Sequence, residues 1–384
     1  MKLPALVSFV VFVFSFLPFS EWYSIDDVWL RFAVLFVGCS CLIFSKLPYL
    51  NVKSHDRPSN LTRVIRIFLL MAWSLAGLSF LIGEIPLMVM LQGAIDYKEI
   101  QFPPLIAIVC QSLALIGACL SSLNLIYSAS LRKALYLLFF LMLFIAFVGR
   151  GIFMVWALFS LSLFLNSRGW LSLLGARKMF KFGFAVVLLV AVFSSIGEYR
   201  SNLNVNFNKA GHVNTSIIRF LAEPTAEFDA VGLPDSFLWV YVYGISPLAN
   251  LESLDRQPNT SDLKKFFLSF VPDFAMRYFS SIPVKDKSYL VNDFFNTYTG
   301  FVTGVEVFGV FGIFLTSTIM LLILYFSTIV LPPSSYRDVY IALYSTYFAM
   351  MWFSNIFVKD IYSFALFISF VFALTARNVK TRQG

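Results

Sequence analysis

Four arginines lie at the edges of apolar runs, where a membrane surface would meet a polar ligand: Arg150, Arg200, Arg219 and Arg277. A planar guanidinium keeps its charge and binds phosphate oxygens through paired hydrogen bonds. When a bond from a sugar to a diphosphate breaks, negative charge grows on the leaving oxygens, and preplaced arginines stabilise that transition state more than the ground state. These positions therefore suit a lipid diphosphate, although each arginine could instead anchor a helix end at the headgroups.

Arg150 is the most informative of the four because it interrupts a long apolar run. A guanidinium between two apolar segments is costly unless it meets an anion, a cavity or carbonyl oxygens. Gly149 and Gly151 flank it, and glycine lets a ligand or another backbone approach closely. The alternative is a helix hairpin whose arginine extends to headgroup phosphates.

A sugar hydroxyl that attacks such a bond gains from a general base. Six candidates occur near the arginines, and the sequence alone does not choose among them: Glu198, His212, Glu223, Glu227, Asp229 and Asp235. We take Arg150, Arg200, Glu198 and His212 as the predicted catalytic set. His212 could also be an ordinary exposed histidine.

The sequence indicates no metal site and no cofactor. The chain has two histidines, His55 and His212, in different loops, and its four cysteines all lie inside apolar runs. This inventory assembles neither a histidine and cysteine metal cage nor a disulfide framework. Asp26 and Asp27 could bind a divalent ion, but adjacent carboxylates ahead of an apolar run are more often solvated. The net charge of +8 does not indicate nucleic acid, because cytoplasmic loops of membrane proteins are basic.

The composition predicts an all-α polytopic integral membrane protein. Hydrophobic residues make up 59% of the chain, charged residues 13%, and phenylalanine occurs 45 times, against about 45–50% apolar and about 25% charged in ordinary globular domains. A bilayer core of about 30 Å needs about 20 helical residues. On this basis we expect about ten transmembrane helices, in a range of eight to twelve, at 3–20, 28–45, 64–83, 104–127, 134–149, 151–166, 182–197, 300–330, 339–357 and 361–376.

Charge sets the predicted orientation. The apolar run 134–166 has basic residues on both flanks, so both flanks should be cytoplasmic, and the run should turn at Gly149-Arg150-Gly151. The short outer loops then hold only four basic residues, Arg31, Lys98, Arg150 and Lys359. Both termini are expected in the cytoplasm. The predicted organisation is a membrane bundle at 1–197, a large periplasmic loop at 198–297 and a second bundle at 298–384.

The loop 198–297 is too long to be structureless, so we expect a partly helical functional element. Its apolar stretch Phe237–Leu248 is too short to span a membrane and contains Gly244 and Pro247, which predicts a re-entrant or interfacial segment. The stretch from Lys264 to Phe279 combines basic and aromatic residues, a composition typical of a helix that lies at lipid headgroups.

This arrangement resembles the Wzy-type O-antigen polymerases, the oligosaccharide repeat-unit polymerases of bacterial inner membranes. The resemblance covers the whole chain in architecture. Local features agree as well: the Gly149-Arg150-Gly151 turn, and Arg200 followed by ten residues and then Gly211. The segments around Tyr241-Val242-Tyr243, Ser246 to Leu251 and Asn296 to Thr299 are also similar. A second arginine-ten-glycine motif is absent from the predicted periplasmic loops.

The resemblance implies a metal-independent glycosyltransferase that joins undecaprenyl-diphosphate-linked glycans, donor to acceptor, at the periplasmic face. It also implies a chain-length regulator as a partner, besides membrane lipids. The residues expected to bind substrate are Arg219, Arg277, Tyr241, Tyr243, Asn250 and Tyr298. The alternatives are an O-antigen ligase and a lipid-linked oligosaccharide flippase. The flippase is disfavoured because few charged residues lie at mid-membrane depth.

Overall fold

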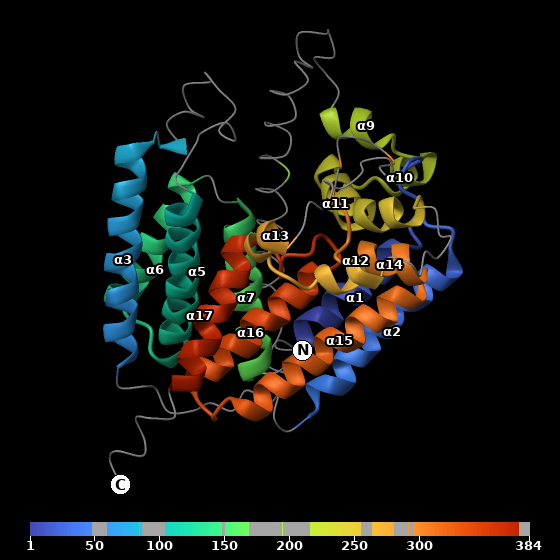
Figure 1. Cartoon of the computed structure of the whole chain (residues 1–384). Coiled ribbons are helices and arrows are strands. Elements are labelled where there is room, and N and C mark those ends of the chain that lie inside the picture. The colour runs from blue at the N-terminus through green and yellow to red at the C-terminus, as the bar shows by residue number, and fades with distance from the viewer. Residues whose placement is uncertain are drawn as a thin grey trace.

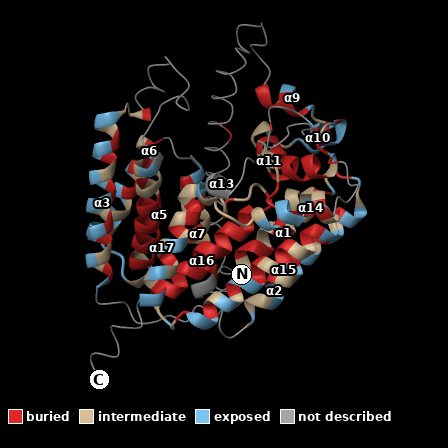
Figure 2. Cartoon of the chain, in the orientation of Figure 1, coloured by how far each residue is buried: buried red, intermediate tan, exposed pale blue. Residues whose placement is uncertain are grey.

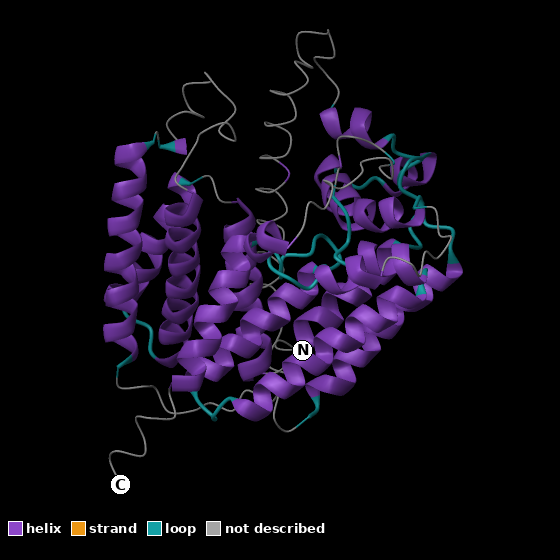
Figure 3. Ribbon diagram, in the orientation of Figure 1, coloured by secondary structure: helices purple, strands orange, loops and turns teal. Residues whose placement is uncertain are grey.

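A computed structural model of the chain describes residues 1–47, 60–83, 85–86, 104–147, 150–168, 194, 216–254, 263–279, 291, 295 and 297–375. Every named element in this part of the chain is a helix (Figures 1 and 3). The helices are α1 (Lys2–Phe14), α2 (Val28–Ser45), α3 (Leu61–Ile82), α5 (Pro104–Tyr127), α6 (Leu131–Ala146), α7 (Arg150–Arg168), α9 (Ile217–Ala222), α10 (Ala226–Val231), α11 (Asp235–Glu252), α12 (Leu263–Leu268), α13 (Asp273–Phe279), α14 (Val302–Phe308), α15 (Phe311–Val330), α16 (Ser335–Met350) and α17 (Asp360–Thr375).

Four of the described helices are long and apolar enough to cross a membrane, namely α2, α3, α5 from Leu105 onward, and α15. Three shorter apolar helices accompany them: α1, the Gly151–Leu165 part of α7, and α17. The outward faces of the long helices carry many large apolar side chains, such as Leu81 of α3 and Phe326 of α15. This combination indicates a helical membrane protein, in agreement with the composition.

Helix α16 is the centre of the bundle. All of its residues are buried (Figure 2), although it is rich in tyrosine, serine and threonine. These polar side chains are tolerated in the core because their hydroxyl groups donate hydrogen bonds to backbone carbonyl oxygens, including those of neighbouring helices. The Tyr344 hydroxyl donates to the carbonyl of Met320 at 2.7 Å, and the Tyr347 hydroxyl donates to that of Tyr362 at 2.9 Å. Helix α16 thus ties α15 and α17 to the core.

Small residues let α3 and α5 approach each other closely, the usual way in which membrane helices associate. Ala72 and Ala76 of α3 are fully buried, as are Cys110 and Cys119 of α5. The Cys110 thiol donates to the carbonyl of Ala72 at 3.2 Å. On the same helix, a Cβ atom added at Gly117 would overlap the ring of Phe140 from α6.

The apolar run 134–166 forms two helices, as the charge pattern predicted. Helix α6 ends at Ala146 and α7 begins at Arg150. The two residues between Phe147 and Arg150 lie outside the described part of the chain. The predicted seventh span, 182–197, also lies outside it, apart from Ser194.

The expectation of one span at 300–330 was wrong. The chain breaks at Gly309, which has φ 60° and ψ −154°, a backbone conformation that strongly favours glycine. Helix α14 then folds back against α15, and Gly304 meets Gly312 so closely that a Cβ atom at either would overlap the other's backbone. Helix α15 alone, with 20 residues, is long enough to span.

Helix α1 is shorter than the expected span 3–20. It ends at Phe14, and the chain then runs through Pro18, whose ring disfavours continuation of a helix. Residues 18–25 instead continue along α9, α10 and α11, which gather at one end of the bundle (Figure 1). We call these three helices the cap, and that end of the bundle the cap end.

Candidate functional site

The cap is held together by an arginine that binds two carboxylates. Arg219 of α9 contacts Asp229 of α10 at 2.8 Å and Asp235 at the start of α11 at 2.8 Å. The hydrogen bond that the Arg219 guanidinium donates to Asp229 raises its pKa above the ordinary value. Burial acts in the opposite direction, and the hydrogen bond to Asp235 raises the pKa further. The predicted substrate contact Arg219 is therefore engaged in joining the three cap helices.

The cap docks on the segment that follows α1. Ser20 pairs with Pro224 in an isolated antiparallel bridge, and the backbone N–H of Glu21 donates to the carbonyl of Glu223 at 2.9 Å. The Ser20 hydroxyl also donates to the carbonyl of Ala222. Phe19 packs against the rings of Phe228 and Tyr241. This contact joins parts of the chain that are 202 residues apart.

Tyr241, which was expected to touch substrate, lies inside this contact. It is fully buried, and its hydroxyl lies 2.5 Å from the carbonyl of Leu17 and 3.2 Å from that of Tyr23. Burial raises the pKa of Tyr241 to about 12. In this structure the side chain positions the segment after α1 and faces no open surface.

Asn250 has a similar positioning role. It is fully buried, and its amide nitrogen donates to the carbonyls of Phe295 at 3.0 Å and Thr297 at 2.9 Å. Its side-chain oxygen accepts from the N–H of Val291 at 3.0 Å. Asn250 therefore fixes the stretch that leads to α14 on the surface of α11.

Two further predicted substrate contacts are only partly buried. The ring of Tyr243 stacks on Trp239 at 5.8 Å between centroids and meets Phe295 edge to face. Tyr298 lies just after the segment that Asn250 holds and is also half-buried.

Helix α11, which carries Tyr243, is continuous through Gly244 and Pro247. Neither residue breaks the helix, and the lack of a side chain at Gly244 leaves room for the ring of Phe14.

A carboxylate at the end of α11 completes the docking of the cap. Glu252 accepts hydrogen bonds from the backbone N–H groups of Asp26, at 3.1 Å, and Asp27, at 2.7 Å. Burial raises the pKa of Glu252, while the hydrogen bond from Asp26 acts in the opposite direction. Asp27 in turn caps α2, because its carboxylate accepts from the N–H groups of Trp29 and Leu30. The Asp26-Asp27 pair is thus explained by helix capping and docking.

A second cluster at the cap end joins the starts of α7, α13 and α17. The hydroxyl of Tyr362 on α17 lies against Gly151, where it would be 2.7 Å from an added Cβ atom. The backbone N–H of Asp273, the first residue of α13, donates to the carbonyl of Val358 at 2.7 Å. The amide of Asn355 donates to the carbonyl of Ser269 at 3.1 Å. We call this region, with the link 351–359 before α17, the junction.

The junction brings together elements that carry two of the predicted arginines. Arg150 begins α7, and Arg277 lies one turn after the start of α13. The side chains of both residues lie outside what the structure describes. Glu198, Arg200 and His212 belong to segments outside the described residues altogether. The sequence pointed to Arg150 through its two glycines, and the structure shows that the close neighbour of Gly151 is Tyr362, which no sequence pattern singled out.

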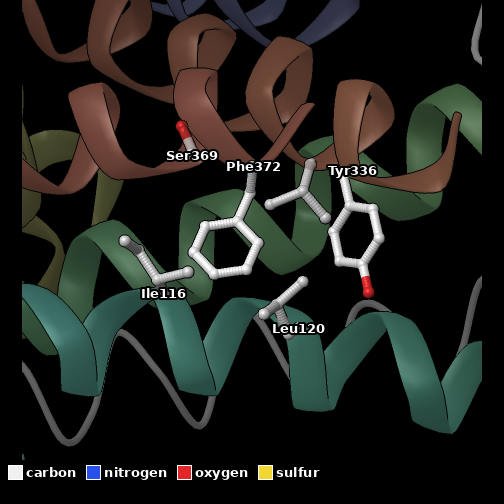
Figure 4. Close-up of a pocket in the computed structure, with 6 residues that line it drawn as sticks. Ile116, Leu120, Tyr336, Ser369 and Phe372 are labelled. Carbon is white, nitrogen blue, oxygen red and sulfur yellow. The ribbon is translucent and has the colours of Figure 1, made fainter. Parts of the chain in front are cut away.

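The described residues contain no group of three or more histidine, cysteine, aspartate or glutamate side chains that could hold a metal ion. One small apolar cavity, of about 10 Å³, lies between α5, α16 and α17 (Figure 4). It is lined by Ile116, Leu120, Tyr336, Val339, Ser369 and Phe372. Such a volume holds about one water molecule, so this cavity is not a place for a sugar or a diphosphate.

No family model, no curated protein and no solved structure matches the chain.

Proposed function

We propose that this chain is a membrane glycosyltransferase that polymerises oligosaccharide repeat units carried on undecaprenyl diphosphate. The reaction would take place at the periplasmic face of a bacterial inner membrane, with the junction and the cap on that face and both termini in the cytoplasm. The single observation that supports this proposal best is the junction, where the helices that carry Arg150 and Arg277 both contact the segment around the start of α17, at the end of an apolar bundle.

In the proposed reaction, the anomeric carbon of the donor glycan leaves the diphosphate oxygen and forms a new bond to a hydroxyl of the acceptor glycan. The diphosphate departs with the bonding electrons, and Arg150, Arg200 and Arg277 would stabilise its growing charge. The proton of the acceptor hydroxyl passes to a base, which we assign to Glu198 or His212. Among the other candidate bases, Asp229 and Asp235 are engaged by Arg219.

The proposal is tested by Arg150→Ala in a strain that depends on this chain for its surface polysaccharide. We expect the variant to insert normally but to yield lipopolysaccharide with single repeat units. Arg63→Ala is the matched control, because Arg63 is an exposed arginine at the start of α3, away from the junction. Long chains in the Arg150→Ala strain would remove the role of this arginine.

The deletion strain separates the two alternatives. Loss of all O-antigen from lipid A, with long glycans retained on the lipid carrier, would indicate a ligase. Accumulation of lipid-linked repeat units on the cytoplasmic leaflet would indicate a flippase.

A further inference from the structure

Two arginines from neighbouring helices meet at one tyrosine, at the end of the bundle opposite the cap (Figure 1). The Nε–H of Arg66 on α3 donates to the Tyr136 hydroxyl of α6 at 2.8 Å, and the guanidinium carbon lies 5.9 Å from the centroid of the Tyr136 ring. The guanidinium of Arg132, one turn before Tyr136 on α6, interacts with the same hydroxyl. We call Arg66, Arg132 and Tyr136 the Tyr136 cluster.

The charge of the Tyr136 cluster is not balanced by a carboxylate. Within the part of the chain that the structure describes, the ion pairs lie in the cap and between α12 and α14. The first turns of α3 and α6 contain no acidic residue. Both Arg66 and Arg132 are exposed, and the hydrogen bond to Tyr136 uses only the Nε–H of Arg66. The terminal nitrogens of that guanidinium can therefore bind an anion.

The arginines do not serve to stabilise their own helices. Helix α3 begins at Leu61 and α6 at Leu131, and neither N-cap residue forms a side-chain capping hydrogen bond. A cation near a helix start, as at Arg132, opposes the positive end of the helix dipole. The arginines and the two helix starts act in the same direction, which is to attract an anion.

The surroundings of the Tyr136 cluster indicate an anion that carries an apolar part. Ile67 and Leu70 follow Arg66 along α3 and are 47% and 69% exposed, and Leu135 and Leu138 of α6 are 43% and 51% exposed. Helix α3 is long and apolar enough to cross a membrane. The cluster thus lies where an apolar surface ends, which is the level of lipid headgroups for a helix that spans a bilayer.

We infer that the Tyr136 cluster binds the phosphate of an anionic phospholipid, in the leaflet opposite the cap, with the acyl chains along the exposed faces of α3 and α6. Guanidinium groups suit phosphate oxygens because their planar fork donates paired hydrogen bonds. The hydroxyl of Tyr136 is a positioning group that holds Arg66 and Arg132 at one point. This inference does not depend on the proposed function. In the proposed topology, the leaflet is the cytoplasmic one.

The test uses the full-length protein in detergent, with phosphatidylglycerol or phosphatidylcholine of the same acyl chains added, and native mass spectrometry to measure the lipid bound. We expect the wild type to bind phosphatidylglycerol more tightly than phosphatidylcholine. Arg66→Ala and Arg132→Ala should each weaken binding of phosphatidylglycerol by about tenfold, the effect of losing one charge-assisted hydrogen bond.

Tyr136→Phe separates a built site from a general attraction of charges, because it leaves the net charge unchanged. It removes the hydroxyl that positions the guanidinium groups, so we expect binding of phosphatidylglycerol to weaken by about threefold. Arg63→Ala is the matched control, since Arg63 is an exposed arginine one turn before Arg66 on the same helix. It should stay within about twofold of the wild type, because a charge outside the contact is largely screened.

Equal binding of the two lipids by the wild type would overturn the inference. Equal weakening by Arg63→Ala and Arg66→Ala would overturn it too, as would unchanged binding in Tyr136→Phe. Displacement of phosphatidylglycerol by inorganic phosphate would identify a soluble anion as the ligand and would overturn the lipid site. Should Arg66→Ala fail to insert, Arg66→Lys and Tyr136→Phe decide the matter, and wild-type binding in both would contradict the inference.

Discussion

At the scale of single residues, Arg219 shows how an arginine predicted to bind substrate can be structural. It bridges Asp229 and Asp235 with both contacts at 2.8 Å, and its side chain is 33% exposed. We expect Arg219→Ala to lower the free energy of unfolding by about 1 kcal/mol, because pairs this exposed are partly screened by solvent. Thermal unfolding in detergent measures the change. A double-mutant cycle with Asp235→Ala should show coupling, and independent effects of the two changes would contradict this role.

Glu252 predicts a pH dependence of stability. Burial raises the pKa of its carboxyl in the folded state, so the folded state binds this proton more tightly than the unfolded chain does. Stability from this group is then full below the unfolded pKa, about 4.3, and is lost as pH rises through the folded pKa. We expect wild type to gain stability relative to Glu252→Gln as pH falls from neutral toward the unfolded pKa. Melting temperatures of both proteins at several pH values give the answer, and a constant difference would contradict the prediction.

At the scale of elements, the hairpin of α14 and α15 depends on two glycines in contact. A Cβ atom at Gly312 would overlap the backbone of Gly304, and backbone cannot move aside as a flexible side chain can. We expect Gly312→Ala to destabilise the protein by about 1–3 kcal/mol, the usual effect of overpacking. Gly77→Ala is the control, because nothing lies within 4 Å of an added Cβ atom at Gly77 in α3. Melting temperatures of the two variants in the same detergent test this, and equal values would contradict the hairpin.

The elements also show what apolar patterning can and cannot predict. It located α2, α3 and α5 within a few residues, because these helices are long and apolar along their whole length. It missed the break at Gly309, since a turn between two apolar helices leaves no polar signal. Nor could it show that α11 stays continuous through Gly244 and Pro247, where Gly244 packs against the Phe14 ring of α1.

At the scale of the whole molecule, the proposed topology places the cap and the junction on one side of the membrane and the α15–α16 turn on the other. We therefore expect a cysteine at Glu223 or Lys264 to react with an impermeant maleimide when the outer membrane is opened. A cysteine at the exposed Pro333 should react only after detergent treatment. The background must lack Cys39, Cys41, Cys110 and Cys119, which are free thiols. The opposite labelling pattern would invert the topology.

The candidate site was only partly predictable from the sequence. Arginine chemistry and the two glycines singled out Arg150, and the junction shows which elements surround its backbone. The roles of Tyr241 and Asn250 could not be foreseen, because they depend on carbonyl groups of distant segments.

The contact between Ser20 and the cap also bears on how the protein is made. The two partners are 202 residues apart, and a ribosome adds about 5–20 residues each second. The early segment must therefore wait on the order of 10–40 s before α9 emerges to cover it. During that interval Phe19 and Tyr23 have no native neighbours from the cap, so biogenesis of this protein should be sensitive to the factors that shield newly inserted chains.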